Sequence, residues 1–106
     1  MLSKTDPSKS IARLCLLQWG DVLVTRDQGE PVRSRLLALI RSHETVEVDL
    51  NGLEALTPSF VDEVFGKALQ EIGRDEFRHK VKLMADSQEV RRLVNLVLSN
   101  RSVMKS

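Results

Sequence analysis

The feature that most constrains the fold is the segment at residues 45–50, in which apolar and polar side chains alternate. Val46, Val48 and Leu50 fall on one face of an extended chain, and acids occupy the positions between them. Successive side chains of a strand point to opposite faces, so this pattern predicts a strand that is buried on one face only. Parallel strands covered on both faces read instead as continuous apolar runs. We therefore expect helices on one face of the sheet, which disfavours a doubly wound nucleotide-binding fold.

Segments with strand and helix periods alternate along the rest of the N-terminal half. A short apolar run at residues 11–19 predicts a first strand, and residues 22–24 predict either the second arm of a hairpin or a connector. Pro31 suits the first turn of a helix, so we expect a helix to begin within residues 29–31. The apolar positions of this first crossover helix recur at helical spacing: Val32, Leu36, Leu39 and Ile40.

The second half of the chain repeats this order of elements. Residues 60–72 carry a helical apolar stripe that ends at Gly73, where a C′ glycine belongs. Alternation at residues 77–85 predicts another strand, with His79 on its apolar face. Ser87 is placed to cap a last helix. The order of elements is therefore strand, helix, strand, helix, strand, helix.

This order predicts an α/β fold with a mixed or parallel sheet of about four strands and helices on one face. A chain of 106 residues fits a single domain. We expect that domain to span residues 11–106, after a flexible segment at residues 1–10. The polar tail at residues 100–106 is expected to be frayed.

Composition narrows the classes of function. Aromatic residues make up only 4 % of the chain, which argues against a stacking platform for single-stranded nucleic acid. No apolar run approaches the roughly 20 residues of a membrane span. Cys15 is the only cysteine, so it has no partner for an internal disulfide. We expect a cytoplasmic protein with no membrane segment.

The chain shows no constellation of catalytic residues. The two histidines, His43 and His79, lie in different segments, and neither has a metal ligand at the spacing of a zinc site. A lone histidine on an apolar face is typical of a core residue. No glycine-rich phosphate-binding motif is present. We therefore expect no enzymatic activity, no catalytic residues, no metal and no cofactor.

The net charge of +1 averages three blocks of different sign. Residues 1–42 carry +3, residues 43–72 carry −6, and residues 73–106 carry +4. Such asymmetry bears on partners and on association rates. Two interpretations are open: the blocks pair with one another inside the fold, or the acidic block is a surface for a partner.

A basic face is predicted on the strand at residues 77–85. Arg78, Lys80 and Lys82 would project from the open side of the sheet, where they form a conceivable stripe for phosphate contacts. A solvated strand face explains the same residues. Because the net charge is only +1, nucleic acid is the less favoured partner.

The turn before the helix at residues 60–72 carries the most informative polar residues. Thr57 is a good N-cap with Pro58 at the first helical position, whereas Ser59 with Asp62 three residues later is a capping-box variant. Only one of these hydroxyl residues can be the N-cap. In both cases a hydroxyl lies at the positive end of a helix, where a phosphate would be stabilised and where a structural cap also belongs.

The stretch V-D-L-N-G-L-E-A-L-T-P-S-F at residues 48–60 resembles the STAS superfamily, whose best-known members are anti-sigma factor antagonists. In those proteins a strand that ends in Asp leads through an apolar connector of this length to a D-S-[ST]-G-type turn. The closer likeness is to a STAS-like family of unknown function with a T-P-S-F-[AV]-D-E run, here residues 57–63. The V-T-R-D-Q-G segment at residues 24–29 is similar to that family's Arg-containing approach to the first helix.

The resemblance covers residues 20–101 and implies a single domain with helices on one face of the sheet. It also implies a regulatory, non-enzymatic role. Well-studied members bind a switch kinase or an anti-sigma factor and are phosphorylated on a serine of the turn. Here Pro58 stands at the acceptor position and Thr57 where the Asp would be, so Ser59 and Thr57 are the hydroxyls left in the turn.

The leading hypothesis from the sequence is a module that binds a protein partner, such as an ATP-binding kinase-like protein or an anti-sigma-like regulator. Its surface would combine the turn with the acidic side of the following helix: Thr57, Pro58, Ser59, Phe60, Asp62 and Glu63. The alternatives are a phospho-switch on Ser59 or Thr57 and an association with nucleic acid through the basic face. The pattern leaves the oligomeric state open, a homodimer included.

Overall fold

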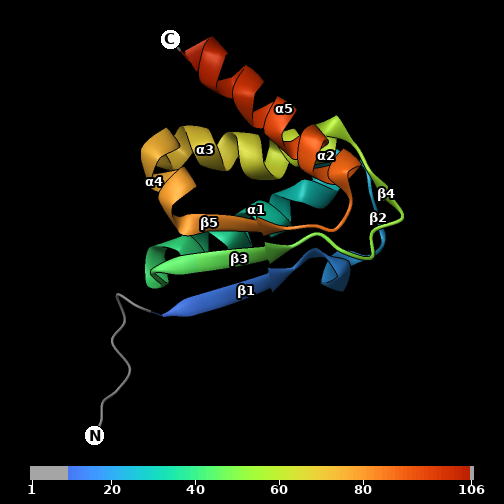
Figure 1. Ribbon diagram of the computed structural model, residues 1–106, viewed down its shortest axis with the longest axis horizontal. Helices are drawn as coiled ribbons and strands as arrows, with labels where there is room; N and C mark the ends of the chain where they lie inside the picture. The colour runs from blue at the N-terminus through green and yellow to red at the C-terminus, as the bar shows by residue number, and fades with distance from the viewer. Residues whose placement is uncertain (1–9, 106) are drawn as a thin grey trace, which may run out of the picture.

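The protein, seen here in a computed structural model, contains two parallel sheets (Figure 1). Residues 10–105 are described, with side chains through Arg101, so most of the segment expected to be flexible at residues 1–10 lies outside the described residues. The larger sheet has the order β1-β3-β5, with β1 at Ile11–Cys15, β3 at Thr45–Asp49 and β5 at Val81–Met84. The smaller sheet pairs β2 (Val22–Leu23) with β4 (Ala55–Leu56).

The helices connect these strands as crossovers. A 3-10 turn, η2 (Leu16–Trp19), follows β1, and α1 (Arg26–Ser42) leads to β3. Three pieces then form one continuous helical stretch: α2 (Pro58–Val61), the π-helical turn η3 (Asp62–Gly66) and α3 (Lys67–Ile72). The chain continues through α4 (Arg74–Lys80), β5 and α5 (Gln88–Lys105). No helix among the described residues combines the length and the apolar character needed to cross a bilayer.

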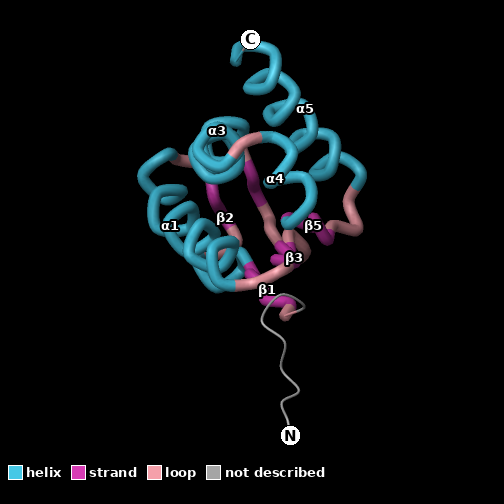
Figure 2. The backbone as a smooth tube through the Cα atoms, turned by 90° about the vertical axis from the view of Figure 1, so that its left-hand side faces the viewer, coloured by secondary structure: helices cyan, strands magenta, loops and turns pink. Residues whose placement is uncertain are grey.

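The helices gather on one side of the larger sheet, as the alternation predicts (Figure 2). Leu14, Val46 and Val48 are buried toward the helices. In the strand register Arg13 lies beside Glu47, which lies beside Lys82, and this row occupies the other face. The sequence-based prediction of an α/β fold with parallel strands and a one-sided helical layer is therefore confirmed.

The hairpin interpretation of residues 22–24 is wrong. Residues Val22 and Leu23 form β2, which pairs in parallel with Ala55 and Leu56 of β4, and an antiparallel pairing is what a hairpin requires. The short second sheet lies at the end of the molecule where β1 and β3 finish (Figure 1). It supports the turn that precedes α2.

The first helix begins earlier than Pro31 suggests. Thr25 is its N-cap: the Thr25 hydroxyl accepts from the Gln28 N–H at 3.1 Å, and Gln28 Oε1 accepts from the Thr25 N–H at 3.0 Å. This reciprocal capping box satisfies the free N–H groups of the first turn, and it places the start at Arg26. The T-x-x-Q spacing of this capping box is visible in the sequence.

The predicted strand at residues 77–85 is wrong in its first half. Residues Arg74–Lys80 form α4, and only Val81–Met84 are extended. Phe77 and Val81 are four residues apart, a spacing that fits a helix as well as a strand. His79 is consequently exposed on α4, with its Nε2 3.9 Å from Glu44 Oε2, and is not a core residue.

The last helix confirms its predicted cap and corrects its predicted end. The Ser87 hydroxyl accepts from the Val90 N–H at 3.2 Å, and Val94 is fully buried against the core. The helix does not fray at residue 100 but runs to Lys105. Arg101 lies in this continuation, and its side chain reaches the middle of the molecule.

We predict that Gly29→Ala destabilises the protein although alanine favours helix. A Cβ at Gly29 would lie 3.0 Å from Glu63 Cβ and 3.2 Å from Val64 Cγ2, which are buried and cannot easily move. We expect a loss of about 1–2 kcal/mol in the free energy of unfolding, measured by urea denaturation. The exposed Ser34→Ala on the same helix is the matched control and should be neutral. A higher urea midpoint for Gly29→Ala would contradict the close packing of α1 on η3.

Candidate functional site

Thr57 caps the helical stretch that begins at α2. Its backbone is extended, its Oγ1 accepts from the Phe60 N–H at 3.3 Å, and Pro58 occupies the first helical position. The same hydroxyl donates to the Val24 carbonyl at 2.7 Å. The sequence left the N-cap open between Thr57 and Ser59. The structure shows that Thr57 is the N-cap and that the Ser59 side chain does not cap the helix.

Backbone pairing and a buried side chain fix the turn, while two of its residues are exposed. The Thr57 N–H donates to the Leu23 carbonyl at 3.3 Å, which extends the pairing of β2 with β4 into the turn. Phe60 is fully buried in the core, so it fixes the turn from inside and does not belong to its surface. Pro58 and Ser59 are exposed. The turn therefore presents these two residues on a backbone with little freedom.

Two exposed apolar side chains lie at the same end of the molecule as the turn. Leu17 on η2 is 44 % exposed and Val22 on β2 is 45 % exposed. A Cβ on Gly52 would lie 3.2 Å from Leu17 Cδ2, which places η2 beside the connector that leads to β4. Leu17 and Val22 thus add exposed apolar area at this end of the molecule.

Asp62 is held by arginines from both ends of the chain. Arg101 on α5 donates through Nε to Oδ1 at 2.7 Å and through Nη2 to Oδ2 at 2.8 Å, and Arg26 Nη1 donates to Oδ2 at 2.9 Å. Only 18 % of the Asp62 side chain is exposed. The hydrogen bonds from Arg101, and then those from Arg26, lower the pKa of Asp62 to about 2 against the opposing effect of burial. Asp62 is therefore ionised at neutral pH.

Glu63 is buried, with 4 % of the residue exposed. Arg33 Nη1 donates to its Oε2 at 2.5 Å, Lys67 Nζ lies 3.1 Å from Oε1, and Arg26 Nη1 lies 3.4 Å from Oε1. Burial raises the pKa of Glu63, but the hydrogen bonds from Arg33, Lys67 and Arg26 outweigh it, so its pKa is lowered. The expectation that this acid lies on a surface face is wrong.

These contacts explain the three charge blocks. Arg26 and Arg33 come from the first basic block, Arg101 comes from the last, and all three pair with the acidic middle block. Arg41 with Glu71 and Arg13 with Glu47 add pairs of the same kind. Of the two interpretations, internal pairing is the one that the structure shows for Asp62 and Glu63.

Gly66 makes room for the Asp62–Arg101 pair. A Cβ at this position would lie 2.3 Å from Asp62 Oδ1 and 3.1 Å from Arg101 Cγ. The residue is the last of the π-helical turn η3, in which the helix widens by one residue per turn. The glycine and the π turn together allow the carboxylate of Asp62 to meet α5.

The predicted basic stripe does not form. Arg78 and Lys80 lie on α4, and Lys80 Nζ donates to the Ile40 carbonyl at 2.6 Å. Lys82 alone of the three lies on the open face of the sheet. The geometry that suggested a nucleic-acid interface is therefore absent. Among the described residues no group of three His, Cys, Asp or Glu side chains is arranged to hold a metal ion.

Among the cations around Asp62 and Glu63, only Arg26 falls in a segment that the family resemblance singles out, and nothing in that segment indicates its ion pairs. Lys67 stands four residues after Glu63, a pairing that helical spacing predicts. Arg26, Arg33 and Arg101 lie 30 or more positions from their partners, and no local signal identifies such pairs.

We predict that Asp62→Asn lowers stability in a pH-dependent way. The pKa of Asp62 falls from its ordinary value of 3.8 to about 2, so its ionised form stabilises the fold above pH 3.8 and this contribution disappears as the pH falls toward 2. At pH 7 the variant should lose about 2 kcal/mol of unfolding free energy, and the difference from wild type should vanish near pH 2.

Urea denaturation at a series of pH values measures this difference. Asp21→Asn is the matched control, because Asp21 is exposed and its carboxylate has no partner among the described side chains. A wild-type stability that changes with pH in the same way as that of Asp62→Asn would contradict the assignment.

The turn and the two acids that follow it, Asp62 and Glu63, lie in a segment that a family profile matches. The profile of a STAS-like domain of unknown function matches residues 28–91, more than half of the chain and the whole of the turn. No curated protein and no solved structure matches the chain. The match agrees with the resemblance carried by the T-P-S-F-V-D-E run at residues 57–63, and the chain belongs to this family of STAS-like domains.

Proposed function

We propose that this STAS-like domain is a regulatory, non-enzymatic module that binds a protein partner through the turn before α2. The observation that carries the proposal is the contrast within the turn: Thr57 is fixed by two hydrogen bonds of its hydroxyl, while Pro58 and Ser59 are exposed. A surface that is already ordered loses little conformational entropy when it binds. A partner of the kind implied by the family likeness is an ATP-binding kinase-like protein or an anti-sigma-like regulator.

The proposed surface differs from the one expected from the sequence. Pro58 and Ser59 form its centre, and the exposed Leu17 and Val22 extend it with apolar area. Phe60 and Glu63 are buried, and Asp62 is largely covered, so these residues position the turn from beneath. Binding of the partner therefore depends on the shape and apolar character of the turn more than on acidic charge.

We predict that Ser59→Glu and Val22→Glu weaken binding of the partner, because each substitution places a carboxylate in a contact that apolar side chains surround. Proteins that co-purify with the tagged chain from its native cell are quantified for each variant. Ser34→Glu on α1 is the control, since Ser34 is also an exposed serine but lies outside the surface. The proposal fails if the same proteins are recovered in equal amounts with Ser59→Glu, Val22→Glu and wild type.

A phospho-switch on the same turn is the second candidate function. The Thr57 hydroxyl is half-buried and occupied by Val24 and Phe60, whereas Ser59 is exposed. A kinase has access to Ser59 without breaking the cap. Ser59 precedes Asp62 by three residues on the helical stretch, so a phosphate there would compete with Asp62 for Arg26. Phosphorylation of Ser59 would thereby weaken the Arg26–Asp62 ion pair, which helps to hold the turn.

We predict that, under this second function, the phosphate is found on Ser59 and not on Thr57. Intact-mass measurement after incubation with ATP and an extract of the native cell detects the modification, and fragmentation locates it. Ser59→Ala should abolish the added mass, and Thr57→Ser, which keeps the cap, should retain it. Phosphate on residue 57, or none on either residue, would count against the switch.

A further inference from the structure

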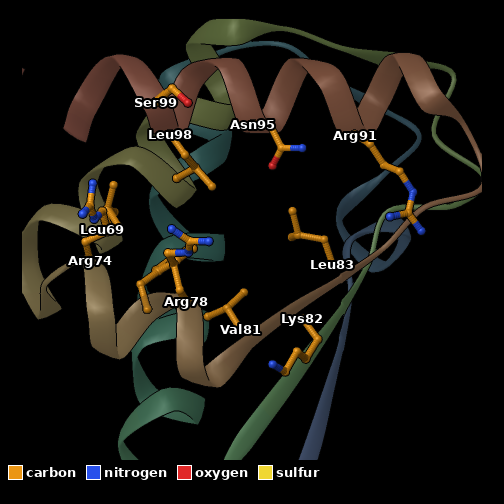
Figure 3. Close-up of a pocket in the computed structure, with 11 residues that line it drawn as sticks. Leu69, Arg74, Arg78, Val81, Lys82, Leu83, Arg91, Asn95, Leu98 and Ser99 are labelled. Carbon is orange, nitrogen blue, oxygen red and sulfur yellow. The ribbon is translucent and has the colours of Figure 1, made fainter. Parts of the chain in front are cut away.

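A cavity of about 640 Å³ lies between β5 and α5, away from the turn before α2 (Figure 3). Its size is within the range of about 300–1,000 Å³ that is typical of small-molecule sites. One wall is the free edge of the sheet, because β5 is the last strand in the order β1-β3-β5. The opposite wall is α5, and residues of α3 and α4 close one end.

The lining of the cavity combines an apolar base with cations. The apolar side chains come from four different elements: Leu69, Phe77, Val81, Leu83 and Leu98. Arginine and lysine residues lie among and around them: Arg74, Arg78, Lys82 and Arg91. Asn95 and Ser99 add an amide and a hydroxyl from α5, and none of the described residues that line the cavity is acidic. This combination matches a ligand with an apolar body and a negative group.

The cations that line the cavity have no acidic partner among the described residues, unlike the cations that pair with Asp62 and Glu63. Arg74, Arg78 and Lys82 have no side-chain hydrogen bond or ion pair to any of the residues that the structure describes. Arg91 donates through Nε to the Ala85 carbonyl at 2.7 Å, which leaves its two terminal nitrogens available. Arg78 extends from α4 into the middle of the cavity in Figure 3, and Lys82 points away from its centre. An unpaired arginine that extends into a partly apolar cavity attracts anions.

An added peptide strand fits the edge of β5 less well than a small molecule does. The Val81 N–H donates to the Phe77 carbonyl at the end of α4, and the Ala85 carbonyl accepts from Arg91. The backbone groups at both ends of this four-residue edge therefore already have hydrogen-bond partners within the protein. Strand addition derives its affinity from a run of free main-chain groups, which this edge lacks.

We propose that the cavity binds a small organic anion, with its apolar body against Leu83 and Leu98 and its carboxylate or phosphate group at Arg74 and Arg78. The site is separate from the proposed docking turn and does not depend on it. Such a ligand would touch β5 and α5 together.

Titration of the full chain with an alkyl series tests the proposal. Decanoate and decyl phosphate carry the two negative groups, and decanol carries the same alkyl chain without charge. Isothermal calorimetry and amide chemical shifts, below micelle-forming concentrations, should show that both anions bind more tightly than decanol, with shifts centred on β5 and α5. The tighter of the two anions identifies the preferred group. Equal affinity for decanol, no binding of either anion, or binding of an acidic peptide in preference to both would overturn the proposal.

Variants place the ligand in the cavity. Arg78→Gln should weaken binding of the anions about tenfold through loss of a charge-assisted hydrogen bond, and should leave decanol unaffected. Asn95→Phe adds bulk at an exposed position of α5 and should block both anions without unfolding the protein. Arg35→Gln removes an equally unpaired, exposed cation on α1 and is the matched control. Unchanged affinity in Arg78→Gln and in Asn95→Phe would show that the anions bind elsewhere.

Discussion

The rest of the structure depends on the ion pairs of Asp62 and Glu63. Two adjacent acids, one buried and one largely covered, are surrounded by Arg26, Arg33 and Arg101. A buried carboxylate without partners would cost several kcal/mol, so removal of one of these cations is expected to destabilise the fold. They come from α1 and α5, which means that the pairs tie the first and last helices to η3. The net charge of +1 therefore conceals an internal pairing of strongly charged segments.

The same constraint shapes the turn before α2. The close approach of Gly29 to Glu63, and of Gly66 to Arg101, shows that α1, η3 and α5 meet with little spare room. Thr57 begins the helical stretch that carries both acids, and its hydroxyl is bonded to Val24 just before α1. The exposed residues of the turn are therefore presented by a rigid base. This rigid base supports the proposal that the turn binds a protein partner.

Much of the fold could be predicted because it is encoded in local patterns. The alternation at residues 45–50, the stripe at residues 60–72 and the helix start within residues 57–59 each depend on neighbours a few positions apart. The prediction of a strand at residues 77–80 is wrong because the spacing of Phe77 and Val81 fits a helix as well as a strand. The burial of Glu63 could not be predicted for another reason: Arg26 and Arg33, which pair with it, are remote in sequence. Arg101 in particular lay in a polar tail that gave no sign of a contact.

The two proposed binding surfaces, the cavity beside β5 and the turn before α2, follow from where the cations lie. Some cations pair with Asp62 and Glu63, and others, left unpaired on α4, line the cavity beside β5. The turn before α2 lies at another end of the molecule, where the short sheet of β2 and β4 supports it. A small anion and a protein partner would therefore bind at distinct places on one small domain.

A double-mutant cycle on Asp62 and Arg101 tests the central claim most directly. Unfolding free energies of wild type, Asp62→Asn, Arg101→Gln and the double variant give the coupling energy between the two side chains at neutral pH. The bidentate, largely covered pair predicts a coupling of about 1.5–3 kcal/mol, as for hydrogen bonds between charged groups. Additive effects within about 0.5 kcal/mol would contradict the claim that this pair holds α5 to the centre of the fold.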